Sequence, residues 1–274
     1  MGHLMRCGYS CRRACRVSSL SRSTLRHKAE LRAERDNEVV EQIQRVVKKH
    51  RRYGCPRVYA QLRRQGLLIN RKRVHRLWKK EGFSLRRKGR RKRHIVTGQE
   101  RVHKAEYPNH IWTYDFIEDR TANGNRLRIL SVLDEFHREC LCLRVERSFP
   151  ASKVIETLEF LFLLKGKPMY LRSDNGPEFI AKAVKGWLGT QEVKPVYIEP
   201  GSPWQNGFVE SFHDKLRDEC LNQEIFANIS EARALIETWR EYYNNERLHS
   251  GLGYRTPAEF AAQFNNQTEP ILSS

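Results

Sequence analysis

The sequence has no hydrophobic run long enough to span a bilayer. Its most apolar stretch, residues 158–164, is followed at once by Lys165, whereas a spanning helix needs about 20 apolar residues. The N-terminus is cationic, but no apolar segment follows it, so we see no secretory signal. The 7 cysteines are an odd number without regular spacing, which argues against a disulfide framework. We therefore expect a cytoplasmic protein with no membrane partner.

Several common catalytic patterns are also missing. The sequence has no glycine-rich phosphate loop, so ATP-driven chemistry is not expected. No Ser-His-Asp or Cys-His arrangement suggests a covalent nucleophile. Cys7, Cys11 and Cys15 recur every four residues, but they lack the fourth ligand and the paired spacing of a zinc site. We expect these three cysteines to be small buried thiols.

Positive charge is concentrated in the first part of the chain. The 274 residues include 51 Lys and Arg and 32 Asp and Glu, a formal net charge of +19. Residues 1–104 carry 32 of the basic and 7 of the acidic side chains, whereas residues 105–274 carry 19 and 25. A solvated basic surface is the alternative. So many cations in one segment favour the electrostatic binding of nucleic acid.

The basic part of the chain predicts three segments. Residues 1–50 predict a basic helical segment, whose clearest helix, residues 36–50, has apolar side chains at helical spacing. Residues 51–84 predict a helix-turn-helix-like DNA-binding unit. Residues 85–104 are rich in Arg and Lys around glycine and predict an extended basic linker that follows a phosphate backbone.

The helix-turn-helix prediction for residues 51–84 depends on one signal that ends a helix and one that begins the next. A helix over residues 57–65 is expected to end at Gly66, and Asn70 is expected to cap a second helix over residues 71–81. A basic helix of this kind suits phosphate contact or entry into a DNA groove, although a basic spacer without sequence preference would look similar. The side chains expected to contact DNA are Arg57, Arg71, Lys72, Arg73, Arg76 and Lys79.

Residues 105–264 predict a separate α/β core, followed by a disordered tail over residues 265–274. The Asn123-Gly124 pair is a strong hairpin signal between the first two strands. We expect strands over residues 110–117, 127–133, 140–145, 168–172 and 193–198, and helices over 152–164, 178–188, 207–221 and 230–245, the last capped by Ser230. Three consecutive strands followed by alternating helices and strands predict a mixed sheet with helices on its faces.

Three carboxylates stand out in this core. Asp115 lies inside the first strand between aromatic residues, where an ionised group needs a positive partner. Asp174 follows the end of another strand, the position at which α/β sheets bind ligands. Glu210 lies one turn into a helix, on a face apart from its apolar stripe. Oxygen ligands of this kind suit Mg²⁺, and a pair of such ions can assist phosphoryl transfer.

Other acidic residues near these positions have simpler interpretations. Asp214 is the best substitute for Glu210, but it lies one turn further along the helix. Glu178 lies at a predicted helix start, where it would interact with the helix dipole. Asp134 and Glu135 are expected to end a strand at the surface.

Three motifs resemble those of the DDE transposase and retroviral integrase core: YDF at residues 114–116, RSDNGPEF at 172–179 and PWQNGFVES at 203–211. Asp174 and Glu210 are separated by 35 residues, the interval typical of the integrase-like branch. The segment from Asn245 to Pro257 resembles the C-terminal part of second-frame transposases from insertion sequences with two overlapping reading frames. The segment from Tyr53 to Phe83 resembles the helix-turn-helix unit that precedes their core.

This resemblance implies a ribonuclease H-like fold and cleavage and joining of DNA ends, dependent on Mg²⁺ or Mn²⁺, with two ions expected. Asp115, Asp174 and Glu210 would be the metal ligands. A basic residue seven positions after the glutamate often contacts DNA in the family, and here it is Arg217. The family also implies double-stranded DNA as partner, homo-oligomers on DNA, a bacterial, nucleoid-associated location and a first-frame product as fusion or partner. Two alternatives are a catalytically silent DNA-binding regulator and a ribonuclease on the same fold.

Overall fold

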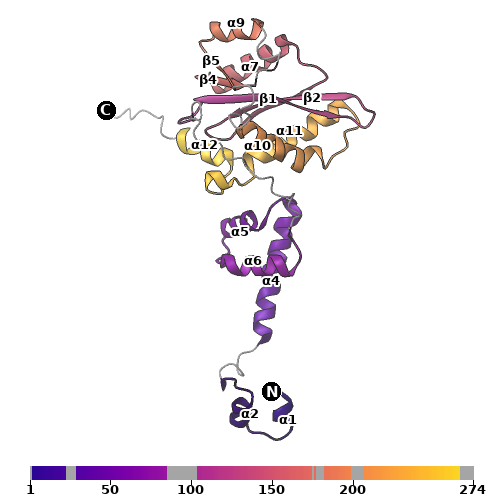
Figure 1. Cartoon of the computed structure of the whole chain (residues 1–274), viewed down its shortest axis with the longest axis vertical. Helices are drawn as coiled ribbons and strands as arrows, with labels where there is room; N and C mark the ends of the chain where they lie inside the picture. The colour runs from indigo at the N-terminus through magenta and orange to yellow at the C-terminus, as the bar shows by residue number, and fades with distance from the viewer. Residues whose placement is uncertain are drawn as a thin grey trace, which may run out of the picture. The chain divides into compact units, whose positions relative to one another are not determined.

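The computed structural model describes residues 2–22, 29–84, 104–174, 176, 182–198 and 207–265. The chain divides into two compact units, residues 1–89 and 90–274, and each is described by itself (Figure 1). Most of the predicted linker, residues 85–103, and most of the predicted tail, residues 266–274, lie outside the described residues. Within the part of the chain that is described, no helix combines the length and the apolar character needed to cross a membrane.

The first unit is helical in all its described elements. These are α1 (Gly2–Arg6), α2 (Cys11–Val17), α4 (Ala29–Lys49), α5 (Cys55–Arg64) and α6 (Arg71–Lys80). The cysteine prediction is only partly right, because Cys15 is buried while Cys7 is exposed and Cys11 is intermediate. A thiol on one exposed helical turn has too little protein around it to be buried.

Helices α4, α5 and α6 pack against one another, with a small core that includes Ile43, Leu62 and Leu77, all fully buried. The predicted signals between α5 and α6 are confirmed. Gly66 has a φ of +87°, which glycine adopts without a steric penalty. The Oδ1 atom of Asn70 accepts a hydrogen bond from Lys72 N at 2.8 Å, which satisfies one of the free N–H groups at the start of α6.

The second unit contains a five-stranded mixed sheet, as the sequence predicts. Its strands are β1 (Ile111–Arg120), β2 (Arg126–Asp134), β3 (Cys140–Glu146), β4 (Tyr170–Ser173) and β5 (Lys194–Tyr197). They lie in the order β3-β2-β1-β4-β5. β1 is antiparallel to β2 and parallel to β4, so the change of direction occurs beside β1. In a sheet of this kind, ligands bind where the strand order reverses.

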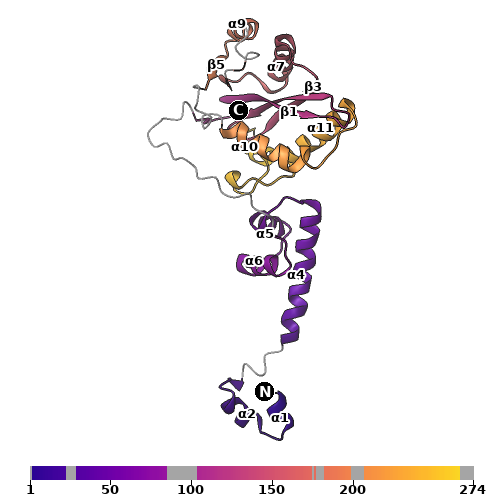
Figure 2. The same ribbon diagram turned by 45° about the vertical axis from the view of Figure 1, so that its right-hand side comes forward.

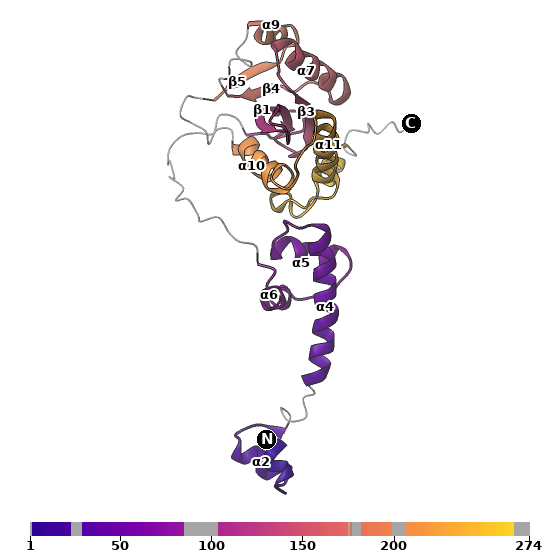
Figure 3. The same ribbon diagram turned by 90° about the vertical axis from the view of Figure 1, so that its right-hand side faces the viewer.

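Helices cover both faces of the sheet, as the turned views show (Figures 2 and 3). On one face lie α7 (Ala151–Lys165) and α9 (Lys182–Thr190); on the other lie α10 (Gly207–Leu216) and α11 (Ile229–Asn245). Side chains alternate along β1, so Trp112 and Tyr114 join the core under α7 and α9. Ile117 joins the core under α10 and α11. Each face therefore has its own apolar core.

The C-terminal part departs from the predicted helices in three ways. The helix begun by α10 continues as a π-helical turn, η2 (Arg217–Leu221). A further helix, α12 (Pro257–Asn265), packs against α11. The cap of α11 is Asn228, whose Oδ1 atom accepts from Glu231 N at 2.9 Å. The prediction of Ser230 as cap is wrong, because the helix begins one residue before it.

A buried ion pair holds the end of α11 to the π-helical turn. Arg247 donates from Nε and Nη2 to the two carboxylate oxygens of Glu219, both at 2.6 Å. The Arg247 side chain is 1% exposed. The two groups meet in a fork-to-fork arrangement, the geometry that makes such pairs strong, while Nη1 of Arg247 is buried and has no hydrogen-bond partner among the described residues.

Candidate functional site

The strand register places Asp115 and Asp174 side by side. In the parallel β1–β4 pair, Ile111 lies opposite Tyr170 and Thr113 lies opposite Arg172. Extending this register by two residues brings Asp174, directly after the end of β4, level with Asp115. Neighbouring strands are about 4.8 Å apart, and level residues project to the same face. This is the face covered by α10, because Asp115 alternates with Tyr114 and Phe116 on the other face.

Contacts on both faces fix β4 against the centre of the sheet. On the α7 side, the hydroxyl of Tyr114 is hydrogen-bonded to the Ser173 side chain. On the α10 side, Arg172 Nη1 donates to Glu135 Oε1 at 2.7 Å and to Oε2 at 2.9 Å. The Ser173 backbone also accepts a hydrogen bond from Ile198 N at 3.1 Å. The strand that delivers Asp174 is therefore held from three directions.

The expectation that Asp134 and Glu135 lie at the surface is wrong. Asp134 is 1% exposed and Glu135 is 4% exposed. Asp134 accepts hydrogen bonds from the backbone N–H groups of Asn109, Phe136 and His137 at 2.9, 2.8 and 3.1 Å. Burial raises the pKa of Glu135 to about 7, against the opposing effect of Arg172. Both acids end β2, as predicted, but they organise a turn beneath the protein surface.

Glu210 projects from the first turn of α10. Its neighbours Val209 and Phe212 are buried in the core, whereas Glu210 itself is exposed, as its helical position predicts. Burial raises the pKa of Glu210, and the nearby Asp214 adds to this effect. Glu210 thus lies exposed at the edge of the site, whereas most of the Asp115 side chain is buried.

The pKa of Asp115 depends on its burial and on the charges of the two other predicted carboxylates. Burial raises the pKa of Asp115 to about 7; a hydrogen bond from Phe116 N, 2.7 Å from Oδ1, lowers it, and the charges of Asp174 and Glu210 raise it further. Burial is the largest of these effects, and the charges of Asp174 and Glu210 add to it. Like charges gathered in a desolvated site require a cation for full ionisation.

A divalent metal ion fits the chemistry of these donors but not yet their spacing. All three donors are carboxylates, which Mg²⁺ prefers. Among the residues that the structure describes, however, no three His, Cys, Asp or Glu side chains are grouped closely enough to hold an ion. The Oδ1 atom of Asp174 accepts from Gly176 N at 2.9 Å, so the groups satisfy local partners as they stand. Asp115 and Asp174 form the rigid part of the candidate site.

His213 is a neighbour of Asp115 that the sequence analysis did not identify. Its Nε2 atom lies 2.8 Å from Ser131 Oγ, and this hydroxyl donates to the Asp115 carbonyl oxygen at 3.0 Å. Since the hydroxyl has one proton, His213 must donate from Nε2, which leaves the Nδ1 lone pair facing Asp115 Oδ2 at 3.8 Å. Burial lowers the pKa of His213 to about 4, so the ring is neutral. Two sequence signals could have predicted this contact. His213 lies three residues after Glu210, on the same side of the helix, and a hairpin centred on Asn123 pairs Ser131 with Asp115.

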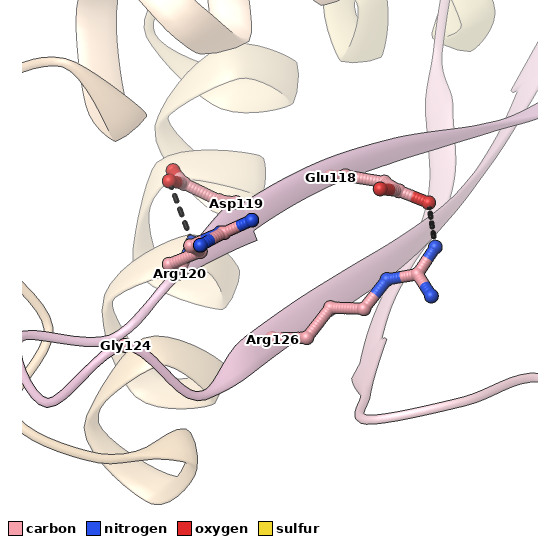
Figure 4. A pocket seen from close by; sticks show the side chains of 5 residues that line it. All are labelled: Glu118, Asp119, Arg120, Gly124 and Arg126. Atoms are coloured by element: carbon pink, nitrogen blue, oxygen red, sulfur yellow. Dashed lines mark hydrogen bonds and ion pairs between the residues drawn. The ribbon is translucent and has the colours of Figure 1, made fainter.

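Arg217 lies beside the far end of β1. Its Nη2 atom donates to the Glu118 carbonyl oxygen at 3.2 Å, and its side chain is exposed. The neighbouring hairpin end forms an open pocket (Figure 4) lined by Glu118, Asp119, Arg120, Gly124 and Arg126. In this pocket Arg126 is ion-paired with Glu118, and Asp119 accepts from Arg120 N. The pocket contains none of the three predicted carboxylates, so it is separate from the candidate site.

The structure divides the predicted DNA-contact residues of the first unit into two groups. Arg73 Nε and Arg76 Nη2 bind the carboxylate of Asp36 on α4 at 2.9 and 2.8 Å. The Arg76 hydrogen bond is the main cause that holds the pKa of Asp36 below its usual range. Arg71, Lys72 and Lys79 are exposed. Arg57 is half-buried, with its guanidinium 5.7 Å from the centre of the Tyr53 ring.

Comparison with known proteins identifies the family. Residues 105–203 and 191–257 match two models described as integrase core domain. The chain is 37% identical over 253 residues to an uncharacterized 31.7 kDa protein of insertion element IS407 from Burkholderia multivorans, covering 92% of this chain and 90% of that protein. It is 30% identical to the transposase InsD of insertion element IS2D from Escherichia coli, covering 83% and 79%. The chain belongs to the DDE transposase family of insertion elements.

Two further similarities concern the architecture of this transposase. Residues 34–93 match a model described as HTH-like domain, which includes α5 and α6. A simian T-cell lymphotropic virus intasome structure aligns with a TM-score of 0.52 at 15% identity, covering 85% of this chain and 76% of that chain. This likeness confirms the predicted integrase-type fold with a helical unit before it. As a family member, the chain acts in DNA transposition.

Proposed function

We propose that this transposase cleaves DNA at the ends of its insertion element and joins the freed ends to a target, with Asp115, Asp174 and Glu210 holding the required divalent metal. In the first step, water attacks the phosphodiester at the element end and frees a 3′-hydroxyl. In the second, that hydroxyl loses its proton and attacks a phosphodiester of another strand, whose own 3′-oxygen leaves as a new 3′-hydroxyl. The same centre can serve both steps because each is an in-line displacement at phosphorus.

The observation that carries this proposal is the register of β1 and β4, which brings Asp174 level with Asp115 on the face that α10 covers, and Glu210 lies in the first turn of that helix. Burial and the charges of the two other acids disfavour ionisation of Asp115. A bound cation would therefore stabilise the ionised carboxylate. Mg²⁺ or Mn²⁺, in a pair, would supply activation of the attacking oxygen and stabilisation of the leaving oxygen. A rotamer change of exposed Glu210 would complete the ligand set around the fixed Asp115–Asp174 pair.

The protein's own residues would position this chemistry. His213 and Ser131 hold the backbone of β1 at Asp115, and the Arg172–Glu135 pair holds the strand before Asp174. Exposed cations on α6 would contact the phosphates of double-stranded DNA, as would Arg217 beside the core. We further infer assembly of several copies on DNA, a nucleoid-associated location in the bacterial cytoplasm, and a first-frame product as fusion or partner.

The decisive experiment compares variants of the proposed ligands with a variant of Asp214, an acid on the same helix as Glu210. Glu210→Gln and Asp174→Asn should each abolish Mg²⁺-dependent nicking and joining of an end-bearing duplex, while DNA binding persists. Asp214→Asn, one turn from Glu210 and equally exposed, is the matched control and should retain activity. A wild-type chain that binds ends without cleaving them would instead be a silent regulator. Cleavage of an RNA–DNA hybrid but not of the duplex would indicate a ribonuclease.

A further inference from the structure

The loop that follows α11, residues 246–255, carries none of the proposed metal ligands. Its backbone is closed by its own contacts, because His249 N donates to Arg255 O at 2.9 Å. The short 3₁₀ turn η3 (Ser250–Leu252) lies between these two residues. Gly251, within η3, is therefore held at a fixed place in the loop.

This loop is fastened to the far end of the helix that carries Glu210. α10 continues directly into η2, and the carboxylate of Glu219 in η2 forms the buried ion pair with Arg247 in the loop. The two groups are 2.6 Å apart, and the Arg247 side chain is 1% exposed, so salt screens the pair very little. The loop and the end of η2 therefore move together.

A second contact of the loop joins Gly251 to Arg138, in the turn after β2. A Cβ atom at position 251 would lie 2.6 Å from Cζ and 2.7 Å from Nη2 of Arg138, closer than non-bonded atoms approach. Gly251 has no positive φ, so the backbone at this position would accept other residues. Glycine is needed because the guanidinium lies against it, and not because of its conformational freedom.

The same guanidinium lies over the start of α10. Cζ of Arg138 is 5.6 Å from the centre of the Phe208 ring, within the range of a cation–π contact. Phe208 is the second residue of α10, and Glu210 is the fourth. Arg138 thus connects the loop to the first helical turn, from which Glu210 projects.

We propose that this loop positions Glu210 by holding the helix at both ends, with Arg247 at η2 and Arg138 at the first turn. The inference rests on the proposed role of Glu210 as a metal ligand. Arg138 is a positioning residue in this arrangement, since it acts on the carboxylate through the helix and not by touching DNA or metal.

The first turn of α10 needs a contact of this kind. The N–H groups of a first turn have no acceptor within the helix, and helix ends fray most readily. Val209 and Phe212 belong to the core under α10 and α11, so they hold only the side of α10 that faces the sheet. The contact between Arg138 and Phe208 adds another point of attachment. When it is lost, the turn that carries Glu210 should open more often.

Hydrogen exchange of the full chain, without DNA or metal, measures this opening directly. In an α-helix the N–H groups of residues 211–214 donate to the carbonyls of residues 207–210, so their exchange reports on the first turn. Arg138→Ala and Gly251→Ala should each speed this exchange by about two- to fivefold, the range that a cation–π contact supports. The methyl group of Gly251→Ala displaces only the end of a flexible side chain, so the fold should be preserved.

Two controls separate this effect from a general loosening of the fold. Gly186→Ala in α9 adds a methyl group that meets no atom of the described residues within 4 Å, and it should leave the exchange of residues 211–214 unchanged. The double variant Arg138→Ala with Gly251→Ala should exchange as Arg138→Ala alone does, because the new methyl group then meets no guanidinium. Thermal unfolding by circular dichroism checks that each variant folds.

The metal dependence of nicking tests the link to Glu210. The Mg²⁺ concentration for half-maximal nicking should rise about two- to fivefold in Arg138→Ala and Gly251→Ala, because a smaller fraction of the chain presents Glu210 in place. The rate at saturating Mg²⁺ and the dissociation constant for DNA should remain as in wild type. A side chain that served folding alone would lower the melting temperature without changing this metal dependence.

The proposal is wrong if the exchange of residues 211–214 is unchanged in both variants, or if Gly251→Ala still speeds it in the Arg138→Ala background. Faster exchange with an unchanged Mg²⁺ dependence would break the link to Glu210. Weaker DNA binding by Arg138→Ala with unchanged exchange would make Arg138 a DNA contact, and this too would overturn the proposal. A wild-type chain that does not nick DNA would contradict the proposed function, while the exchange rates would still decide whether the loop holds the first turn.

Discussion

At the scale of single residues, the candidate site is a region where stability and function oppose each other. Asp115 is held in the sheet by backbone contacts, and its side chain is 23% exposed and subject to the charges of two other acids. The folded protein binds the Asp115 proton with a pKa of about 7, against an ordinary value of 3.8. Metal-free stability should therefore fall as pH rises between these values, because the unfolded chain releases the proton more readily.

This linkage predicts that removing the charge stabilises the metal-free protein. At about pH 8, Asp115→Asn should raise the free energy of unfolding by about 2 kcal/mol, whereas at about pH 4 the variant and wild type should be equal. Urea titrations at the two pH values measure the difference. Mg²⁺ should stabilise wild type and not the variant. Equal stability of both proteins at pH 8 would contradict the pKa that the geometry gives.

At the scale of elements, the start of α11 is fixed by the side chain of Asn228, two residues before the Ser230 cap that the sequence suggested. Asn228 caps α11, and Glu231 reaches back to accept a hydrogen bond from Ala227 N at 2.6 Å. This reciprocal arrangement satisfies two backbone donors that would otherwise lack partners. Ser230, two residues later, is exposed inside the helix.

The two residues can be separated by mutation. Asn228→Ala should lower the free energy of unfolding by about 1 kcal/mol, because an N–H group of α11 loses its acceptor. Ser230→Ala should change it by less than about 0.5 kcal/mol, as is usual for surface positions. Guanidinium denaturation monitored by tryptophan fluorescence would compare them. A larger effect at Ser230 would contradict the cap that the structure shows.

The basic helix α6 should show a similar division between binding and folding. Lys79 is exposed, whereas Arg73 holds α6 to α4 through Asp36. Lys79→Ala should reduce the slope of log affinity for DNA against log salt by about 1, and leave the melting temperature unchanged. Arg73→Ala should lower the melting temperature of this unit. Fluorescence anisotropy across a salt series and calorimetry would measure the two effects, and an Arg73 variant that melts as wild type would contradict its structural role.

At the scale of the whole molecule, most of the predicted DNA-contact residues lie in one unit and the proposed metal ligands in the other. The cations predicted to bind DNA lie mainly in residues 1–89, and the three carboxylates lie in residues 90–274. Each unit has its own buried residues. Affinity and chemistry should therefore be separable.

Separate expression of the two units tests this division. Residues 1–89 should bind duplex DNA without cutting it. Residues 90–274 should retain weak Mg²⁺-dependent nicking, with affinity for DNA at least about tenfold below that of the full chain, since most phosphate contacts are lost. Gel-shift and nicking assays would measure both. Cleavage by residues 1–89 alone would contradict the proposed site.

Local signals in the sequence were enough to predict much of this fold. Gly66 and Asn70 mark the turn before α6, and the Asn123-Gly124 pair marks the first hairpin. The sequence also predicted a strand that contains Asp115 and a strand that ends just before Asp174, whereas the pairing of these two strands became clear only from the structure. Burial of Asp134 and Glu135 was not predicted, because Glu135 pairs with Arg172 on β4 and Asp134 accepts a hydrogen bond from Asn109 N, and both partners are distant along the chain. The contact of His213 with Ser131 required, besides the register that the hairpin signal suggests, a helix packed across the sheet, and this packing is not a local property.

One consequence concerns shortened copies of such a gene. A stop codon just after α11 would leave all three proposed metal ligands intact. It would, however, remove Arg247 and leave Glu219 as a buried charge without its partner at the π-helical turn. Losing one member of a buried pair costs about 3–5 kcal/mol, which is a large part of the stability of an ordinary domain. A truncated reading frame that keeps every active-site codon should therefore yield a protein that is degraded rather than a dominant inhibitor.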